Sequence, residues 1–133
     1  MGKPIKAICA LTLVVLGATP LAAQLSVEVP SGQAITLLEK RVDLDSDIVR
    51  LRFLAPDLAS PLTRPSFEAL GTDLEMLCSE FGLKTLLKDG PTPTQIVISL
   101  SAEPVDFGVM NADVEQVFEA FSVQNDTCML EMF

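Results

Sequence analysis

The sequence predicts an α+β fold, specifically a ferredoxin-like βαββαβ two-layer sandwich preceded by one extra strand. Two observations predict this class. Short apolar segments, alternating or β-branched, are separated by clusters of proline, glycine and aspartate, which is typical of strands joined by turns. Between them lie two segments in which apolar residues recur at helical spacing. The alternative is another α+β arrangement, an antiparallel sheet with two helices on one face.

The first half of the chain predicts two strands and one helix. Residues 33–43 alternate imperfectly, residues 48–54 (IVRLRFL) alternate cleanly, and the acidic turn between them predicts a hairpin. In residues 66–81 the apolar side chains form one helical stripe that includes Cys78. Gly82 then predicts the end of this helix. The motif TDLE inside the segment is either an internal feature or the capping box of a helix that begins late.

The second half predicts a strand, a strand, a helix and a strand. Residues 95–101 (QIVISLS) are β-branched and apolar, and residues 105–109 (VDFGV) alternate. Asn111 fits the N-cap of a helix. The apolar stripe of that helix would be Val114, Val117, Phe118 and Phe121. Residues 128–133 (CMLEMF) predict a short last strand, which completes the βαββαβ order.

The N-terminus has the plan of a secretory signal peptide. Lys3 and Lys6 precede an apolar run over residues 7–18, and small residues follow. The run is shorter than the roughly 20 residues that span a bilayer, so an uncleaved anchor is the less favoured alternative. We therefore expect residues 1–23 to be removed, and residues 24–133 to form a single domain in the periplasm or the medium, with no membrane insertion after cleavage.

Composition limits both the partners and the chemistry. The chain has 18 acidic and 9 basic residues, a net charge of −9, and no histidine, tryptophan or tyrosine. Such a chain is repelled by nucleic acid, which is therefore not expected as a partner. The lack of histidine excludes Ser-His-Asp and Cys-His catalysis and imidazole zinc sites, and no cofactor is predicted. The enzymatic alternative is a small carboxylate-dependent hydrolase with a perturbed acid in a buried pocket.

Two cysteines, Cys78 and Cys128, remain once the leader with Cys9 is removed. An even number of cysteines in an exported chain predicts a disulfide bond. Closing a loop of this size stabilises a fold by roughly 4 kcal/mol at most. The alternative is a pair of buried, reduced thiols that pack as small apolar groups. A redox role is the least favoured, because the sequence contains no C-x-x-C motif.

Three arginines form the first candidate binding site. Arg50 and Arg52 point outward from the second predicted strand, and Arg41 lies across the hairpin. Together they predict a cationic stripe that receives an acidic partner or a carboxylate ligand. The alternative is an ordinary outward polar face, partly neutralised by Glu39 and Asp43.

Three aspartates form the second candidate site. Asp43, Asp45 and Asp47 resemble the start of a calcium-binding loop. However, the glycine expected next is Ile48, and the glutamate expected at the twelfth position is Leu54. A solvated acidic turn is therefore preferred, no metal site is predicted, and calcium or small-ligand binding is the alternative.

Five motifs, VPSGQAITL, RLRFLAP, DLEMLC, PTQIVISLSAEPVDFGV and VFEAF, together resemble a family of short exported bacterial proteins whose domain is of unknown function. The resemblance spans nearly all of residues 24–133, and QIVISLSAEPVDFGV carries most of its specificity. It implies a location in the bacterial envelope and no known activity, so no functional residue is transferred. The resulting hypothesis is a non-enzymatic periplasmic module that binds an envelope protein through a sheet face, the cationic strand or a sheet edge.

Overall fold

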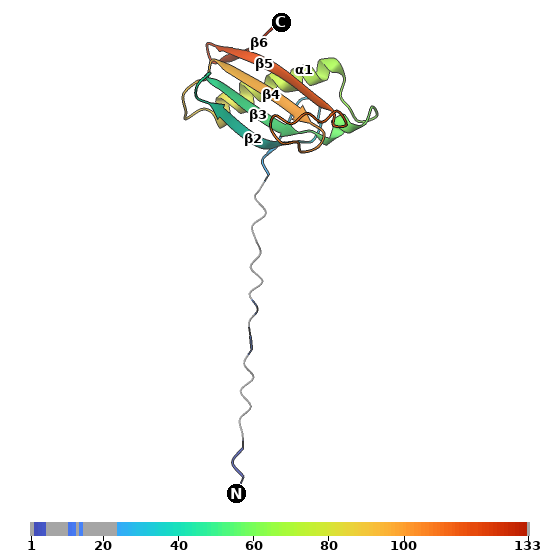
Figure 1. Ribbon diagram of the computed structural model, residues 1–133, viewed down its shortest axis with the longest axis vertical. Helices are drawn as coiled ribbons and strands as arrows, with labels where there is room; N and C mark the ends of the chain where they lie inside the picture. Colours follow the sequence, from blue (N-terminus) through green and yellow to red (C-terminus); the bar gives the residue numbers. More distant parts are fainter. Residues whose placement is uncertain (1, 5–10, 13, 15–23, 133) are drawn as a thin grey trace.

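The computed structural model describes residues 2–4, 11, 12, 14 and 24–132. In this part of the chain, six strands form one twisted mixed sheet, and a helical segment packs on one of its faces (Figure 1). The predicted signal peptide, residues 1–23, falls almost entirely outside the described residues. Among those that are described, no helix has the length and apolar character needed to span a membrane.

The sheet consists of two meanders joined through the helical segment. In chain order the elements are β1 (Ser26–Val27), β2 (Ile35–Asp43), β3 (Ile48–Leu54), the short 3-10 helix η1 (Pro56–Ala59), α1 (Phe67–Met76), the π-helix η2 (Leu77–Leu86), β4 (Gln95–Ser101), β5 (Gln116–Gln124) and β6 (Thr127–Leu130). The strands lie side by side in this same order. Neighbouring strands are antiparallel except β3 and β4, which are parallel. A parallel pair needs a crossover connection, and α1 with η2 supplies it.

The predicted ferredoxin-like sandwich is therefore wrong, as is the alternative with two helices on one face. Both need a second helix, but the residues predicted to form it belong to a loop and to β5. Asn111, the predicted N-cap, instead accepts a hydrogen bond from the backbone N–H of Asp113 within a turn. Val117 and Phe121 are four residues apart, a spacing that fits one face of a helix and one face of a strand equally well. The strand is confirmed by Phe118, which lies on the opposite face and is 72% exposed.

The turn after β5 explains why this segment is extended. Asn125 and Asp126 have φ angles of 52° and 58°, the left-handed pair that joins closely paired antiparallel strands. This turn places β6 directly beside β5, with Val123 opposite Cys128. A helix that ended at this two-residue turn could not pair with β6 as a neighbouring strand does. The turn and the pairing with β6 therefore select the extended conformation.

The segment VDFGV was predicted as a strand, which is also wrong. It belongs to the loop between β4 and β5, residues 102–115. The backbone N–H of Val109 donates to the carbonyl of Asp106 at 3.1 Å, so the chain reverses here. Gly108 has a φ of 80°, a value that residues other than glycine rarely adopt.

The helix predicted over residues 66–81 is present but extends further. Ser66 caps it, because its Oγ accepts a hydrogen bond from the N–H of Ala69 at 3.1 Å. The motif TDLE lies inside α1 and is an internal feature of the helix. Beyond α1 the segment widens into the π-helix η2 and ends at Leu86, so Gly82 lies within it and is not the predicted stop.

Gly82 allows the helical segment to lie close to the sheet. A Cβ atom at this position would lie 3.1 Å from the carbonyl oxygen of Leu77 and 3.2 Å from Cδ1 of Leu51. Both distances are shorter than ordinary van der Waals contact, so a side chain here would require the end of Leu51 or the backbone at Leu77 to shift by a few tenths of an ångström. Glycine thus avoids crowding where η2 meets β3.

The core lies between the helical segment and one face of the sheet. Strands β3 and β4 supply its centre, and their residues alternate between this face and the other, an alternation that the sequence predicts for β3. The buried apolar side chains of these two strands are Val49, Leu51, Phe53, Ile96, Ile98 and Leu100. Burial of apolar surface, at roughly 25 cal/mol per Å², is the main force that holds this layer to the helix.

The predicted disulfide bond between Cys78 and Cys128 is present. It joins η2 to β6 across a sequence separation of 50 residues, and both side chains are buried. β6 lies at the edge of the sheet and pairs only with β5 in the described structure. The disulfide is therefore a second, covalent attachment of this edge strand to the fold.

A buried carboxylate attaches the N-terminal loop to α1. Asp73 is fully buried and accepts hydrogen bonds from the N–H of Ser31 at 2.9 Å, from Oγ of Ser31 at 2.5 Å and from Nε2 of Gln33 at 2.8 Å. These bonds bridge about forty residues of sequence and hold the entry to β2 against the helix.

Candidate functional site

The candidate site lies on the sheet face opposite the helix, where the structure brings Arg41, Arg50 and Arg52 together. Arg41 is paired with Arg50 across the β2–β3 hairpin, and Glu39 is paired with Arg52. Paired residues of neighbouring strands project to the same face. The three guanidinium groups therefore meet on one surface, as the alternation of the second strand predicts.

An irregularity in β2 sets this pairing. The register shifts between Leu37, which is opposite Phe53, and Glu39, which is opposite Arg52. The shift inserts one residue, Leu38, and so moves Glu39 and Arg41 onto the face that carries Arg52. This bulge is also the reason why residues 33–43 alternate imperfectly in the sequence.

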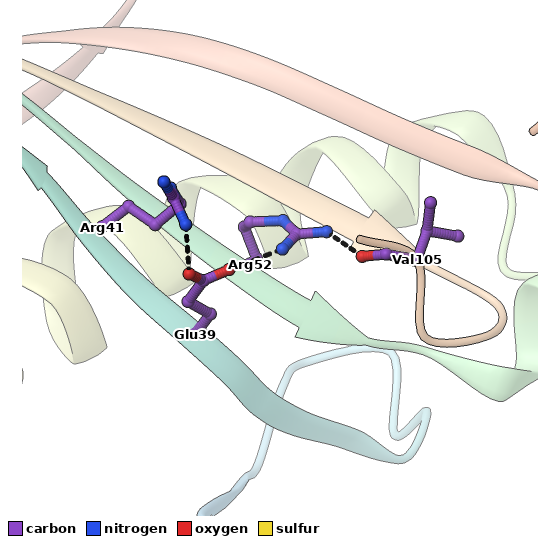
Figure 2. A network of polar contacts seen from close by, with 4 residues as sticks. All are labelled: Glu39, Arg41, Arg52 and Val105. Carbon is purple, nitrogen blue, oxygen red and sulfur yellow. Dashed lines mark hydrogen bonds and ion pairs between the residues drawn. The ribbon is translucent and has the colours of Figure 1, made fainter. Parts of the chain in front are cut away.

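Glu39 binds two of the three arginines. Its Oε1 accepts a hydrogen bond from Nη1 of Arg41, and its Oε2 accepts one from Nη1 of Arg52, each at 2.6 Å (Figure 2). The hydrogen bond from Arg52 and then that from Arg41 are the main causes that hold the pKa of Glu39 below its ordinary value. Arg52 also donates from Nη2 to the carbonyl oxygen of Val105 (Figure 2). One carboxylate thus serves two cations, and the face keeps an excess of positive charge.

The ring of Phe107 lies among the three guanidinium groups. The Cζ atoms of Arg41, Arg52 and Arg50 lie 4.0, 5.7 and 5.9 Å from the centroid of the ring. These distances allow cation–π attraction, which is worth about 0.5 to 1 kcal/mol per pair at exposed sites. The loop of residues 102–115 is thereby held over the sheet, and it forms one wall of the site.

A hollow of about 200 Å³ opens beside this ring. Its lining includes Arg50, Arg52, Ser99, Asp106, Phe107 and Phe118. Its polar groups are two arginines, the neutral side chains of Ser99 and Gln116, and one carboxylate, Asp106, and the rest of the lining is largely apolar. Guanidinium groups bind carboxylates through short, charge-assisted hydrogen bonds, so the hollow is suited to an anionic group attached to an apolar body.

The alternative expectation, a polar face neutralised by Glu39 and Asp43, is met only in part. Glu39 neutralises part of the charge, as described. The carboxylate of Asp43 instead accepts a hydrogen bond from the N–H of Asp45 at 3.1 Å, and hydrogen bonding from Ser46 is the main cause that lowers its pKa. Arg50 contributes only a minor lowering of the same pKa. Arg50 has no ion pair within the described residues.

The three aspartates of the second candidate site lie in the turn between β2 and β3. Two of their carboxylates accept hydrogen bonds from the backbone. Oδ1 of Asp43 accepts from the N–H of Asp45 within the turn, and Oδ2 of Asp47 accepts from the N–H of Thr94 at 3.2 Å. Within the described part of the chain, no group of three or more aspartate, glutamate, cysteine or histidine side chains is arranged to hold a metal ion.

Residues 12–133 match a family described as "Family of unknown function (DUF6497)". The chain belongs to this family. The match covers the whole sheet, the helical segment and the arginines of the site. No curated protein and no solved structure matches the chain. The function of the site must therefore be argued from its geometry.

Acidification is expected to loosen the site. Because the pKa of Glu39 is lowered in the folded protein, its ionised form contributes stability that is present above the unfolded pKa and is lost as the pH falls through the folded pKa. Carboxyl-resolved NMR should give Glu39 a titration midpoint below the ordinary value of 4.5. In Arg52→Met this midpoint should rise toward 4.5, because the main lowering contact is removed. A midpoint at or above 4.5 in the unmodified protein would contradict the geometry of the site.

Proposed function

We propose that this protein is a non-enzymatic binding module that holds an acidic segment of another protein on the surface formed by Arg41, Arg50, Arg52 and Phe107, which we name the arginine face. The observation that carries the proposal is the charge balance. Three guanidinium groups surround one aromatic ring and only two of them are paired, both with Glu39, in a chain whose net charge is −9. In a protein of negative net charge, a surface that concentrates positive charge is where an acidic partner binds most favourably.

The environment of the arginine face also favours a protein partner. The side chain of Arg41 is 43% exposed, whereas that of Arg52 is 16% exposed and serves the loop. Next to the face the loop presents Val109 and Met110 to solvent, and Met110 is 98% exposed. Apolar groups beside cations suit a segment that combines acidic and apolar side chains better than a free inorganic anion.

The disulfide bond and the expected signal peptide support a location of this interaction in the periplasm or outside the cell. A disulfide persists in oxidising compartments and is rare in the cytosol. The partner would then be an exported or envelope protein with an acidic surface segment, which is the class of partner that the sequence leads us to expect.

The double variant Arg41→Gln, Arg50→Gln is expected to weaken this interaction. It removes two positive charges from the face but leaves the bonds that Arg52 makes to Glu39 and Val105. Affinity for a fluorescein-labelled peptide of alternating glutamate and leucine, measured by anisotropy, should fall by about tenfold or more, which corresponds to about 1.4 kcal/mol.

The matched control is Lys84→Gln, Lys88→Gln, which removes the same charge from residues that lie outside the arginine face. It should leave the affinity within about twofold. Equal losses of affinity in both variants would mean that binding depends only on overall charge, which would contradict the proposal. In cells, a photo-cross-linking residue at Met110 should capture a partner in the unmodified background, and this product should disappear in the arginine variant.

A further inference from the structure

A second recessed surface lies on the other face of the sheet, where the helical segment leaves part of β5 and β6 uncovered. Two hollows, of about 340 and 190 Å³, adjoin there between α1 and these strands, and both are lined by Gly71 and Glu119. We name the two hollows together the α1–β5 groove. Its apolar lining includes Leu70, Leu74, Val117, Phe121 and Leu130.

Gly71 is the feature of the groove that the fold does not explain. It lies in the interior of α1, where glycine destabilises a helix relative to alanine. A Cβ atom at this position would meet no atom within 4 Å, so packing does not demand a glycine. A Cβ atom at Gly82, in the same helical segment, would by contrast meet two atoms closer than ordinary van der Waals contact. The lack of a side chain at Gly71 instead keeps the middle of the groove open.

The charge of the groove indicates what would occupy it. Glu75, Glu115 and Glu119 line it, and of these only Glu115 has an ion pair within the described residues, with Arg64 at 3.3 Å. Glu119 projects from β5 on the same face as Val117 and Phe121, so its carboxylate stands beside apolar side chains. An apolar lining with unpaired carboxylates at its border is complementary to a segment that carries apolar side chains and a cation.

Exposed apolar side chains continue the groove at both ends. Phe67, the first residue of α1, is 88% exposed at one end, and Leu130 of the edge strand, opposite Phe121 on the same face, is half exposed at the other. A row of this kind, alongside a recess, is typical of a surface that receives a peptide segment.

We infer that the α1–β5 groove binds a short segment of a partner protein that presents apolar side chains to the lining and a lysine or arginine to Glu75 and Glu119. This chemistry is opposite in charge to that of the ligand of the arginine face, and the two surfaces lie on opposite faces of the sheet. The inference therefore does not depend on the proposed function.

The first test uses a fluorescein-labelled peptide, Lys-Leu-Val-Leu-Lys, and its counterpart with glutamate in place of lysine. The unmodified protein should bind the lysine peptide and not the glutamate peptide in the groove. Gly71→Leu should weaken binding of the lysine peptide by about tenfold or more, because the new side chain fills the space between the hollows. The same variant should not lower the melting temperature, because leucine is a better helix former than glycine. Unchanged binding would overturn the inference.

The second test separates the groove from overall acidity. The double variant Glu75→Gln, Glu119→Gln should weaken binding, whereas Glu28→Gln, Glu103→Gln, which removes the same charge from exposed residues outside the groove, should not. Equal weakening by both pairs would mean unspecific attraction and overturn the inference. Concentration-dependent dimerisation in sedimentation, abolished by Gly71→Leu, would assign the groove to a second copy of this chain and would also overturn it.

Discussion

Removal of the Cys78–Cys128 disulfide is expected to lower the free energy of unfolding by about 2 to 4 kcal/mol. The bond closes a separation of 50 residues and so restricts the unfolded chain, which loses less entropy on folding when it is already closed. The effect should be greatest in β6, because in the described structure this edge strand has β5 as its only strand neighbour. Without the covalent bond, β6 should open more often than the central strands.

The measurement compares urea unfolding of the unmodified protein with that of the double variant Cys78→Ala, Cys128→Ala. The double variant avoids the single free thiol that Cys78→Ser would leave at Cys128, which would allow disulfide-linked dimers to form. Amide hydrogen exchange should show that β6 loses more protection than β3 or β4. A variant as stable as the unmodified protein would mean that the bond does not form or does not contribute.

The central strands were predictable because one pattern fits them and no other. IVRLRFL places its apolar residues on alternate positions, and the predicted limits of this segment and of QIVISLS coincide with β3 and β4. β2 was less clear because the bulge after Leu37 interrupts the alternation. In these strands, apolar residues alternate more clearly in the sequence where the pairing with the neighbouring strand is more regular.

The second helix could not be excluded from local spacing. Val117 and Phe121 satisfy both periods, and the decisive information lies outside the segment, in the left-handed turn at Asn125 and Asp126 and in the register with β4. The parallel contact between β3 and β4 follows from the crossover through α1 and η2, and the strand at residues 116–124 then pairs with the other edge of β4. The sheet order was thus a non-local property.

The candidate site shows the same division. Arg50 and Arg52 share a face because strands alternate, so their grouping was predictable. Phe107 was not, because it reaches the arginines from a loop whose course depends on the bond between Arg52 and the carbonyl of Val105. A useful signal was present in Gly108 and in the turn-forming residues of SAEP, which favour a loop over a strand.

The uneven distribution of charge in the sequence becomes a difference between the two faces of one sheet. Residues 24–64 supply the arginines of β2 and β3, whereas the acidic second half supplies the carboxylates of the groove. Because the sheet separates them, two partners of opposite charge would not collide. Under the two proposals above, the protein holds two segments at once, and each interaction should be lost in variants that leave the other surface intact.

Asp73→Ala is expected to lower the free energy of unfolding by about 2 to 4 kcal/mol, as much as loss of the disulfide. The carboxylate is fully buried and accepts three hydrogen bonds, and its removal leaves Nε2 of the buried Gln33 without a partner. Oε1 of Gln33 already lacks one in the described structure, so the variant would leave the whole amide unsatisfied. The loop that leads to β2 should then detach from α1.

Two further variants identify the cause. Gln33→Met should lower the free energy of unfolding less than Asp73→Ala does. It removes the unsatisfied Oε1 together with the Nε2 donor, and it leaves both hydrogen bonds from Ser31 to Asp73. Ser31→Ala should lower the free energy of unfolding by about 1 kcal/mol, because Ser31 is exposed and the variant loses the hydroxyl's bond to Asp73 and its long bond from the N–H of Gln33 but keeps the backbone bond to Asp73. Urea unfolding of the three variants should therefore rank them Asp73, Gln33, Ser31. If Asp73→Ala were the mildest of the three, the buried carboxylate would not be what fixes this loop to the helix.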